Sequence, residues 1–544
     1  MEKREKQIIS RKRVADHGEV LTARREVDAM LDLVEPETER IESRFLEPAC
    51  GTGNFLVAIL GRKLAVIEQK IARLEAAMKK NEKKSGWKAS FYEPDSLQAL
   101  SSIYGIDILQ DSIKTARSRL LAYYLESYRR IVGRDPSREL TARARFILRK
   151  NLLPGDAIHT QDQVTIRDVP GLDQIIFTEW QRIGNDFKRR EFRFDSLFEK
   201  MKFDVVIGNP PYQLNVGNAG GNRSKAKSIY HLFMQSAINL SPSYVVMITP
   251  SRWMTKTNEG IPKKWVDRML ASNQFRIIHD FEDAGECFPG VSIMGGVNYF
   301  LWEKGYNGPC QYFYHKGSQV FSRVSCLNKL NCGIVVRDPM ACRIIEKIAQ
   351  VEKEYYTDPE NNFSHLVSTK DFYTTKTALT SSWAAFKSRR SAQCRVKYYC
   401  NQANHKTPFG WIREDQIPKN RQTVRLHKIL IPAANGSPVL VLGKPFYAEP
   451  GSVCSQTYLV IGYDPEHPFT DQNQCLNVIS YIKTRFFRYL VSIKKKTQNG
   501  PRGVYQFVPM QDFSKPWTDE ELYRKYGLTV DETAFINSHI RKMD

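Results

Sequence analysis

The residues with the clearest chemical potential lie in the segment Phe203–Tyr212, where an apolar run leads directly into Asn209-Pro210-Pro211-Tyr212. Two successive prolines fix the backbone, so the carbonyl oxygen of Pro210 is held in one direction. With the amide oxygen of Asn209 as a second acceptor, the pair can take both hydrogens of a planar aromatic amino group, which would orient its nitrogen and make it more nucleophilic. Tyr212 offers a ring on which a base could stack. The alternative is a proline-rich turn that merely closes a strand.

A second segment, Phe45–Phe55, combines a short apolar run with a turn of small residues that leads into a helix. Gly51 and Gly53 allow a tight turn and let a ligand approach the backbone closely. The carboxylate of Glu47 beside this turn suits a cationic or hydroxyl-bearing ligand better than a phosphate, which favours a lysine or backbone amides. A Gly-x-Gly pair alone would equally fit a plain βα turn, whereas the whole segment is more specific.

Two acidic residues follow apolar runs further along the chain. Asp107 ends the run that begins at Ile103, where a carboxylate can accept hydrogen bonds from both hydroxyls of a ribose. It lies 54 residues beyond Gly53, and an insert at 62–100 accounts for the excess over the usual spacing of about 20. Asp156 follows the next apolar run and could accept the amino group of an adenine ring. The alternatives are a surface helix cap for Asp107 and an ordinary Gly-Asp turn for Asp156.

Short apolar runs alternate with amphipathic stretches over the first part of the chain, which is typical of a doubly wound α/β sheet. The predicted strands are 44–46, 103–106, 203–207, 244–248, 275–279 and 297–302, and the predicted helices include 54–80, 111–130, 229–240 and 261–271. Only a loop separates the last two strands, which predicts an antiparallel pair at the edge of the sheet. Residues 62–100 read as a helical insert, and 160–200 read as a second, charged insert with no assigned role.

The composition restricts the class of protein. A chain of 544 residues is too long for one ordinary domain, and 42% hydrophobic residues suffice for large cores. No apolar run approaches the roughly 20 residues that span a membrane, and the charged N-terminus lacks a signal-peptide pattern. Ten singly scattered cysteines predict neither a zinc knuckle nor a disulfide framework and favour a reducing compartment. A net charge of +22 favours a polyanionic partner such as DNA over a merely soluble surface.

The pattern predicts three parts: an α/β domain over 1–305, an irregular α+β domain over 306–510 and a helical tail over 511–544. In the tail, Thr518 with Glu521 and Thr529 with Glu532 predict two helix-capping boxes. The densest basic stretch of the C-terminal half is 492–505. Its Lys494, Lys495 and Lys496 could neutralise phosphates, and Arg502 has the geometry to reach a base edge. A solvated face is the alternative, and Ser388–Arg390 and 419–428 are weaker candidates.

Together, these segments resemble the motifs of the amino-methyltransferases of DNA modification systems, and their order resembles the gamma group. Phe281–Trp302 is similar to the late motif of a bacterial subset related to type IIG restriction–modification enzymes, and Gly18–Thr22 loosely matches the leading motif. The resemblance covers roughly 15–305, with a weaker likeness at 490–540. It implies a Rossmann-like, seven-stranded methyltransferase sheet with a C-terminal target-recognition domain. It also implies S-adenosyl-L-methionine as the methyl donor and a flipped adenine in double-stranded DNA as the substrate.

The resemblance also assigns roles to residues. The implied cofactor-binding set is Thr22, Glu47, Pro48, Ala49, Gly51, Gly53, Asp107, Ile108 and Asp156. Asn209, Pro210, Pro211 and Tyr212 would be catalytic, Tyr212 and Phe288 would stack on the base, and Lys494, Lys495, Lys496 and Arg502 would contact DNA. No metal and no cysteine nucleophile is required, so Cys50 is expected to be passive. The implied protein is the adenine-N6 modification enzyme of a bacterial restriction–modification system, cytoplasmic and nucleoid-associated, with a separately encoded endonuclease as a candidate partner.

Several alternatives remain open. Methylation of N4 of cytosine is chemically similar but usually goes with Ser in place of Asn209. Enzymes that methylate a protein glutamine or a guanine in RNA share the motif but lack a C-terminal domain of about 240 residues such as this chain carries. A non-catalytic DNA-specificity subunit would not need the intact segment Asn209–Tyr212. No N-terminal nuclease domain is expected, because only about 20 residues precede Thr22.

Overall fold

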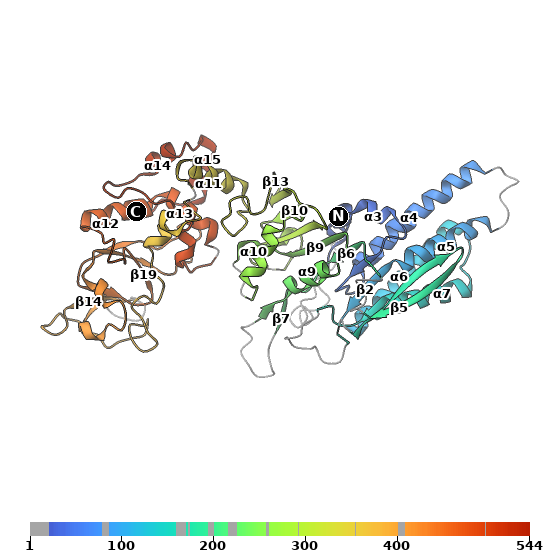
Figure 1. Ribbon diagram of the computed structural model, residues 1–544, viewed down its shortest axis with the longest axis horizontal. Helices are drawn as coiled ribbons and strands as arrows, with labels where there is room; N and C mark the ends of the chain where they lie inside the picture. The colour runs from blue at the N-terminus through green and yellow to red at the C-terminus, as the bar shows by residue number, and fades with distance from the viewer. Residues whose placement is uncertain are drawn as a thin grey trace. The chain divides into compact units, whose positions relative to one another are not determined.

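The structure is a computed structural model that describes residues 21–78, 86–158, 170–171, 174–193, 201–215, 226–256, 260–291, 293–353, 355–400, 408–495 and 497–544. The chain forms two compact units, Met1–Lys329 and Leu330–Asp544 (Figure 1). The first unit therefore ends beyond the expected boundary at residue 305. The reason is that β12 (Cys310–Lys316) and β13 (Gln319–Ser325) extend its central sheet.

The central sheet has the strand order β13-β12-β10-β11-β9-β6-β1-β2-β3. Besides β12 and β13 it contains β1 (Phe45–Glu47), β2 (Ile103–Asp107), β3 (Leu152–Pro154), β6 (Val205–Gly208), β9 (Tyr244–Pro250), β10 (Phe275–Phe281) and β11 (Val297–Glu303). The strands from β3 to β9 run parallel, and β11 is antiparallel to both of its neighbours. The predicted α/β fold is confirmed.

Two details of the predicted sheet were wrong. Among the described residues the sheet has nine strands, because β12 and β13 join the seven expected ones. The antiparallel pairing of β10 with β11 is confirmed, but this pair does not form the edge, since β12 pairs in parallel with β10 and β13 lies outside it. Both added strands lie beyond the point where the regular α/β alternation of the sequence ends.

The helices of the first unit include four that follow the predicted ranges closely, at 54–77, 110–132, 230–239 and 263–271. The described α-helices of this unit are α2 (Arg24–Asp32), α3 (Glu35–Glu39), α4 (Asn54–Ala77), α5 (Trp87–Ser101), α6 (Gln110–Val132), α7 (Arg138–Asn151), α9 (Tyr230–Asn239) and α10 (Lys263–Ala271). The helical insert expected at 62–100 is the remainder of α4 together with α5. It lengthens the connection between β1 and β2 without disturbing their pairing, which matches Phe45 with Ile103 and Glu47 with Gly105.

The insert expected at 160–200 contains an antiparallel hairpin of β4 (Ile176–Ile183) and β5 (Asp186–Arg193). One face of the hairpin packs on the unit through buried rings: the Trp180 Nε1 donates to Asn151 Oδ1 at 2.7 Å, and Tyr104 Oη donates to the carbonyl of Thr178 at 2.8 Å. β5 is largely exposed. The insert is therefore a surface hairpin fixed to the edge of the sheet that ends in β3.

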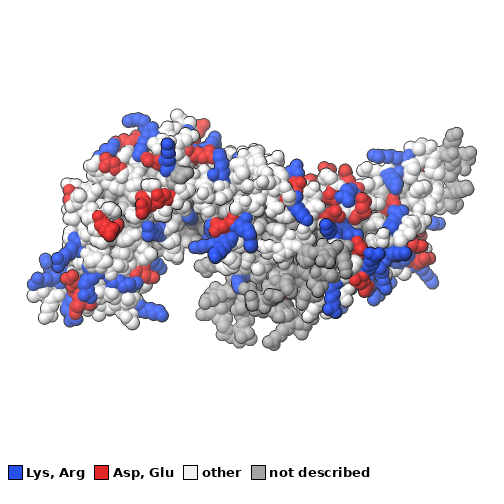
Figure 2. Space-filling view, in the orientation of Figure 1, with Lys and Arg blue, Asp and Glu red and all other residues white. Residues whose placement is uncertain are grey.

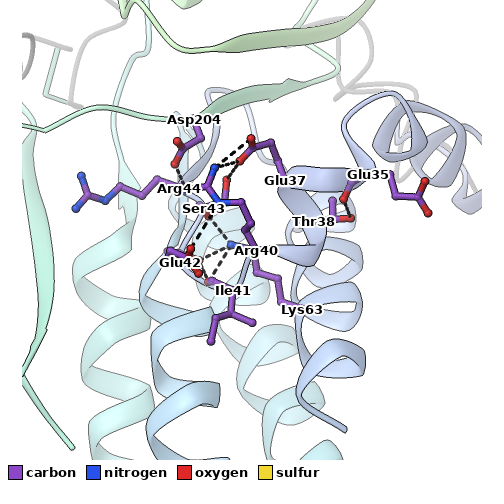
Figure 3. Close-up of polar contacts among 11 residues, drawn as sticks. Glu35, Glu37, Thr38, Arg40, Ile41, Glu42, Ser43, Arg44, Lys63 and Asp204 are labelled. Atoms are coloured by element: carbon purple, nitrogen blue, oxygen red, sulfur yellow. Dashed lines mark hydrogen bonds and ion pairs between the residues drawn. The ribbon is translucent and has the colours of Figure 1, made fainter. Parts of the chain in front are cut away.

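A buried lysine anchors the segment that leads into β1 (Figure 3). Lys63 of α4 is fully buried, and its Nζ donates to the carbonyls of Ser43 and, at 3.2 Å, of Ile41. It also donates to Ser102 Oγ at 2.6 Å, just before β2. Burial lowers the pKa of Lys63 to about 7. The ammonium thus holds together the starts of two neighbouring strands from inside the protein.

A second polar contact fixes the start of β1 against β6. The amide of Arg44 donates to Asp204 Oδ2 at 2.7 Å, and the amide of Asp204 donates to the carbonyl of Arg44 at 2.9 Å (Figure 3). Because β1 has only three residues, fixing its first residues also fixes its last, Glu47.

The second unit contains two hydrophobic cores. One lies around the sheet β15-β14-β18, which consists of β14 (Val396–Tyr399), β15 (Phe409–Ile412) and β18 (Ser452–Cys454). The other packs the sheet β17-β16-β19, which consists of β16 (Lys428–Pro432), β17 (Phe446–Ala448) and β19 (Tyr458–Ile461), against α11 (Pro339–Val351), α12 (Gln472–Lys483) and α13 (Arg485–Lys494).

The C-terminal helices α14 (Asp519–Lys525) and α15 (Val530–His539) belong to this unit. Their Leu522 and Ile536 are buried in the same core as α11 to α13, so 511–544 is not a separate tail. Both predicted capping boxes are confirmed, with Thr518 at the start of α14 and Thr529 at the start of α15. In the described part of the whole chain, no helix is both long and apolar enough to cross a membrane.

The buried ammonium of Lys63 makes a testable contribution to stability. Its folded pKa of about 7 lies below the ordinary value of 10.5, so the unfolded chain binds more protons between these pH values. The free energy of unfolding should therefore rise with pH across this window, by up to about 1.4 kcal/mol per pH unit. In Lys63→Met this dependence should disappear, so denaturant titrations at pH 7 and pH 9 should favour the wild type increasingly at the higher pH. The exposed Lys114→Met is the control, and a wild-type advantage that does not change with pH would contradict the shift.

Candidate active site

The carboxyl ends of β1, β2, β3 and β6 meet at one edge of the sheet and surround a pocket. Its lining contains most of the residues singled out in the sequence: Thr22, Glu47, Pro48, Ala49, Gly51, Asp107, Ile108, Asp156, Asn209 and Pro211. Apolar side chains that the sequence did not identify complete the wall: Leu21, Phe55, Leu109, Ile158, Ile229 and Phe233. The structure therefore brings acids from three strand ends and the Asn-Pro-Pro segment of a fourth into one cavity.

The Asp107 carboxylate holds the glycine turn in place. Its Oδ2 accepts from the amide of Gly51 at 2.8 Å, and its Oδ1 accepts from the amide of Leu109 at 2.8 Å. Gly51 adopts a left-handed conformation with φ of 48°. Asp107 is therefore a structural acceptor as well as a wall of the pocket.

Gly53 does not line the pocket. It starts α4 with φ of 83°, and a Cβ there would come within 3.2 Å of the Cβ of Ala116 on α6. This glycine is required by the turn and by close helix packing, so its place in the expected cofactor-binding set rests only on the resemblance.

Glu47 is the most strongly perturbed acid of the site. Its side chain is buried, and its Oε2 has no hydrogen-bond partner within the described residues. Burial, and then the charge of Asp107, raise its pKa well above the usual range, while Arg119 acts in the opposite direction. A Cβ on Gly208 would lie 3.2 Å from Glu47 Cγ, so the small residue at the end of β6 makes room for this carboxyl. A buried acceptor of this kind is costly unless a ligand donates to it.

Two further residues complete the polar lining. Asp156 Oδ1 accepts from the amide of Ile158 at 2.9 Å, and burial raises the pKa of its carboxyl. The carbonyl of Thr22 accepts from Asn54 Nδ2 at 3.0 Å, which ties the segment before α2 to the glycine turn. Residues 18–20 of the expected leading motif lie outside the described residues.

The Asn-Pro-Pro-Tyr segment extends from β6 into the pocket, with Asn209 and Pro211 in its wall. Tyr212 Oη is buried without a hydrogen-bond partner in the described structure, and burial raises its pKa. The Tyr212 ring meets Phe288 edge to face, with ring centroids 6.5 Å apart and planes at 77°. Phe288 is fully buried. The two rings thus lie together but not as a parallel pair, and their stacking on a base remains a prediction.

The basic stretch expected to contact DNA has its head groups engaged within the second unit. Lys494 Nζ donates to Gln506 Oε1, and Lys495 Nζ donates to the carbonyls of Asn435 and Thr497 at 3.1 and 2.8 Å. Arg502 Nε donates to the carbonyl of Ser364 at 2.8 Å. Lys496 lies outside the described residues. Contact of these four residues with DNA remains a prediction. Because Lys494, Lys495 and Arg502 donate to acceptors within the second unit, the stretch is not simply a solvent-exposed charged surface.

Comparison with known proteins agrees with the geometry of the first unit. Residues 101–288 match the family model of the Eco57I restriction-modification methylase. The match confirms the predicted resemblance to restriction–modification methylases. It spans β2, β3, β6, β9 and β10, and thus Asp107, Asp156 and the Asn-Pro-Pro-Tyr segment.

One curated protein and several solved structures are also similar to this chain, over different shares of its length. An uncharacterized adenine-specific methylase of Mycoplasma pneumoniae is 42% identical over 115 residues, which is 21% of this chain and 27% of that protein. Among solved structures, the DrdV–DNA complex matches at 11% identity and a TM-score of 0.44, over 97% of this chain and 58% of the other. The type IIL restriction–modification enzyme MmeI in complex with DNA matches at 9% identity and a TM-score of 0.43, over 92% and 68%.

Cys50 lies in the pocket wall, outside the residues that the family model matches. Its thiol is buried, and burial together with the charges of Asp107 and Glu47 raises its pKa well above the usual value. None of the ten cysteines, all of which the structure describes, forms a disulfide bond, and Cys326 is exposed whereas Cys50 is buried. The neutral thiol at position 50 contributes a small side chain to the pocket wall, and its passive role stays a prediction.

Because Asp107 accepts two backbone hydrogen bonds, its removal is predicted to destabilise the folded protein. Asp107→Ala leaves the amides of Gly51 and Leu109 without their acceptor and should lower the free energy of unfolding by about 1–3 kcal/mol. Asp107→Asn keeps one oxygen acceptor and should lose less. Denaturant titration of the two variants measures the difference. Equal free energies of unfolding for the wild type and Asp107→Ala would show that the glycine turn does not need these two hydrogen bonds.

Proposed function

We propose that the chain is a site-specific DNA methyltransferase that transfers a methyl group from S-adenosyl-L-methionine to N6 of an adenine flipped out of duplex DNA. The observation that carries the proposal is the single pocket in which Glu47, Asp107 and Asp156 face the same space as Asn209. The first three suit a nucleoside cofactor with a cationic end, and Asn209 suits an amino group. The adenine-specific name of the Mycoplasma relative supports adenine as the base.

The residues of the pocket fit S-adenosyl-L-methionine. The unpaired Oε2 of Glu47 and the carboxylate of Asp107 can accept from an ammonium group and from ribose hydroxyls. Asp156 can accept an adenine amino group, and the flat or branched side chains of Ile108, Ile158 and Phe233 can flank a ring. When bound, the cofactor supplies an electrophilic methyl group on a sulfonium.

The chain's own contribution is to hold and polarise the amino group that is methylated. The amide oxygen of Asn209 and the fixed carbonyl of Pro210 accept its two hydrogens, which draws the nitrogen lone pair out of conjugation. The apolar wall excludes water from the reacting atoms. No strong base is needed from the chain, because N6 loses its proton readily once it carries the methyl group. Duplex DNA as the partner is supported by the net charge of +22, and a role in modification by the family match.

The decisive test is to incubate the purified chain with S-adenosyl-L-methionine and mixed-sequence duplex DNA and to identify methylated nucleosides by mass spectrometry. N6-methyladenine is the expected product. N4-methylcytosine as the product would keep the mechanism but change the base. RNA and protein are offered to the chain in parallel reactions. Methylation of RNA or protein, with none of DNA, would overturn the proposal. Sequencing of the methylated DNA then gives the recognised sequence.

Asn209→Ala should abolish most of this activity. Loss of one fixed acceptor for the amino group is expected to lower kcat by at least two orders of magnitude, by analogy with removal of one preorganised polar group elsewhere. Binding of S-adenosyl-L-methionine, followed by calorimetry, should persist. Asn185→Ala, in the exposed turn between β4 and β5, is the matched control. Turnover of Asn209→Ala near the wild-type rate would refute the assigned mechanism.

A further inference from the structure

We propose that the second unit binds the phosphate backbone of duplex DNA through the outward face of the β14–β15 hairpin and the loop that precedes it. This surface, termed the hairpin face, consists of Lys387, Arg389, Arg390, Arg395, Lys397, Phe409 and Trp411. The inference rests on the proposed function, which supplies DNA as the partner. It places the contact away from the basic stretch at 492–505.

The sequence that forms the hairpin face is depleted of acids. Residues 372–413 contain no Asp or Glu but eight basic residues: Lys376, Lys387, Arg389, Arg390, Arg395, Lys397, Lys406 and Arg413. The whole chain has 59 acidic for 81 basic residues, so positive charge is largely compensated elsewhere. Glu449 pairs with Lys397 and Asp415 pairs with Arg413, both from outside the segment. A segment of this length without acids of its own still favours a local positive potential that attracts a polyanion.

The cations of the loop are available to such a partner. Lys387, Arg389, Arg390 and Arg395 are exposed, and within the described structure none of them forms an ion pair with an acid. Arg395 Nε donates to the carbonyl of Ala392 at 2.7 Å, a contact within its own loop. Lys494 and Lys495 instead donate to Gln506 and Asn435, which lie farther away along the chain. In Figure 2, Lys and Arg side chains gather, with some Asp and Glu among them, over the part of the second unit that carries β14 in Figure 1.

The loop is attached firmly to the hairpin. Lys387 and Trp411 exchange both backbone hydrogen bonds, at 2.8 and 2.7 Å, as an additional bridge beside β15. The Phe386 ring lies directly over Gly410, where a Cβ would come within 2.1 Å of it. A side chain at this position of β15 would displace the ring, so the glycine allows the close approach. The exposed cations therefore start from a fixed backbone.

Alternation along the strands gives the hairpin one inner and one outer face. Val396, Tyr398 and Ile412 point into the core, so Lys397, Phe409 and Trp411 lie on the opposite side. Cations lie over the outer rings: Lys397 Nζ is 4.5 Å from the centroid of Phe409, and the guanidinium of Arg390 is 5.5 Å from that of Trp411. Rings that support charged side chains limit their freedom, which lowers the entropy lost on binding a phosphate.

The acid Glu449 borders the hairpin face. Glu449 pairs with Lys397 at 2.8 Å and accepts from Tyr399 Oη at 2.6 Å. This contact neutralises Lys397, so the phosphate-binding charge is assigned to Arg389, Arg390 and Arg395, and Lys397 with its rings forms the surface beside them.

The test measures binding of the full chain to a fluorescent, mixed-sequence duplex by anisotropy over a series of salt concentrations. In the triple variant Arg389→Ala/Arg390→Ala/Arg395→Ala, affinity at about 0.1 M salt should fall at least tenfold. The slope of log affinity against log salt should shrink by roughly 0.9 for each lost phosphate contact. The control is Lys188→Ala/Arg189→Ala/Arg190→Ala in β5, which removes the same charge from another exposed surface and should keep the slope nearly unchanged.

A second variant keeps the test valid if the triple substitution disturbs folding. Arg389→Glu reverses one exposed charge and should weaken duplex binding while leaving thermal unfolding and S-adenosyl-L-methionine affinity unchanged. Unaltered slopes in both variants, or an equal loss in the β5 control, would overturn the inference while duplex binding by the wild type stands. A wild type that binds and methylates no duplex would overturn the proposed function and this inference together.

Discussion

Parallel pairing of β1 with both β2 and β6 places Glu47, Asp107 and Gly208 at the same edge of the sheet, and every other part of the site is built on this arrangement. Because these strands have only three to five residues, a displacement of their first residues would also displace their last. The hydrogen bonds of Lys63 and Asp204 at the starts of the strands therefore also help to position the site. Lys63 fixes the starts of β1 and β2, and Asp204 fixes the start of β6 against β1.

The site also depends on keeping acids close together in a poorly solvated space. Asp107 is stabilised by the two amides that it accepts from, whereas Glu47 has a buried oxygen without a partner and a raised pKa. One carboxylate is thus satisfied by the fold, and the other awaits a donor from a ligand. This asymmetry explains how a turn can be rigid before a ligand arrives and still offer that ligand a strong contact.

The sequence predicted those features that local patterns determine. Short buried strands read as apolar runs, and the polar residues directly after them, such as Asp107 and Asn209, had to lie at one edge once the strands were parallel. Features that depend on distant partners were missed. Lys63 looks like any lysine of an amphipathic helix, but its partners come from the segment before β1 and from Ser102. Lys495 looks solvated, but it donates to Asn435, sixty residues earlier.

The same reasoning applies to the sheet edge and to the late motif. The exposed, mixed pattern of β13 gives no sign that it continues a large sheet, because only its pairing with β12 reveals it. Phe288 was expected to stack on a base held by Tyr212, which stays a prediction. Its ring contacts Tyr212 edge to face, and this angle depends on packing among neighbours such as Tyr230, which the spacing in the sequence does not give.

Because the Cys50 thiol is buried in the pocket wall, its rate of chemical modification reports on local opening of the pocket. Alkylating reagents attack the thiolate, which burial and the neighbouring carboxylates disfavour as long as the pocket keeps this form. Modification of Cys50 must therefore wait for a local opening that exposes the thiol, and its rate reports how often such openings occur. The exposed Cys326 needs no such opening, so its modification rate gives the reference rate of the reagent in the same chain.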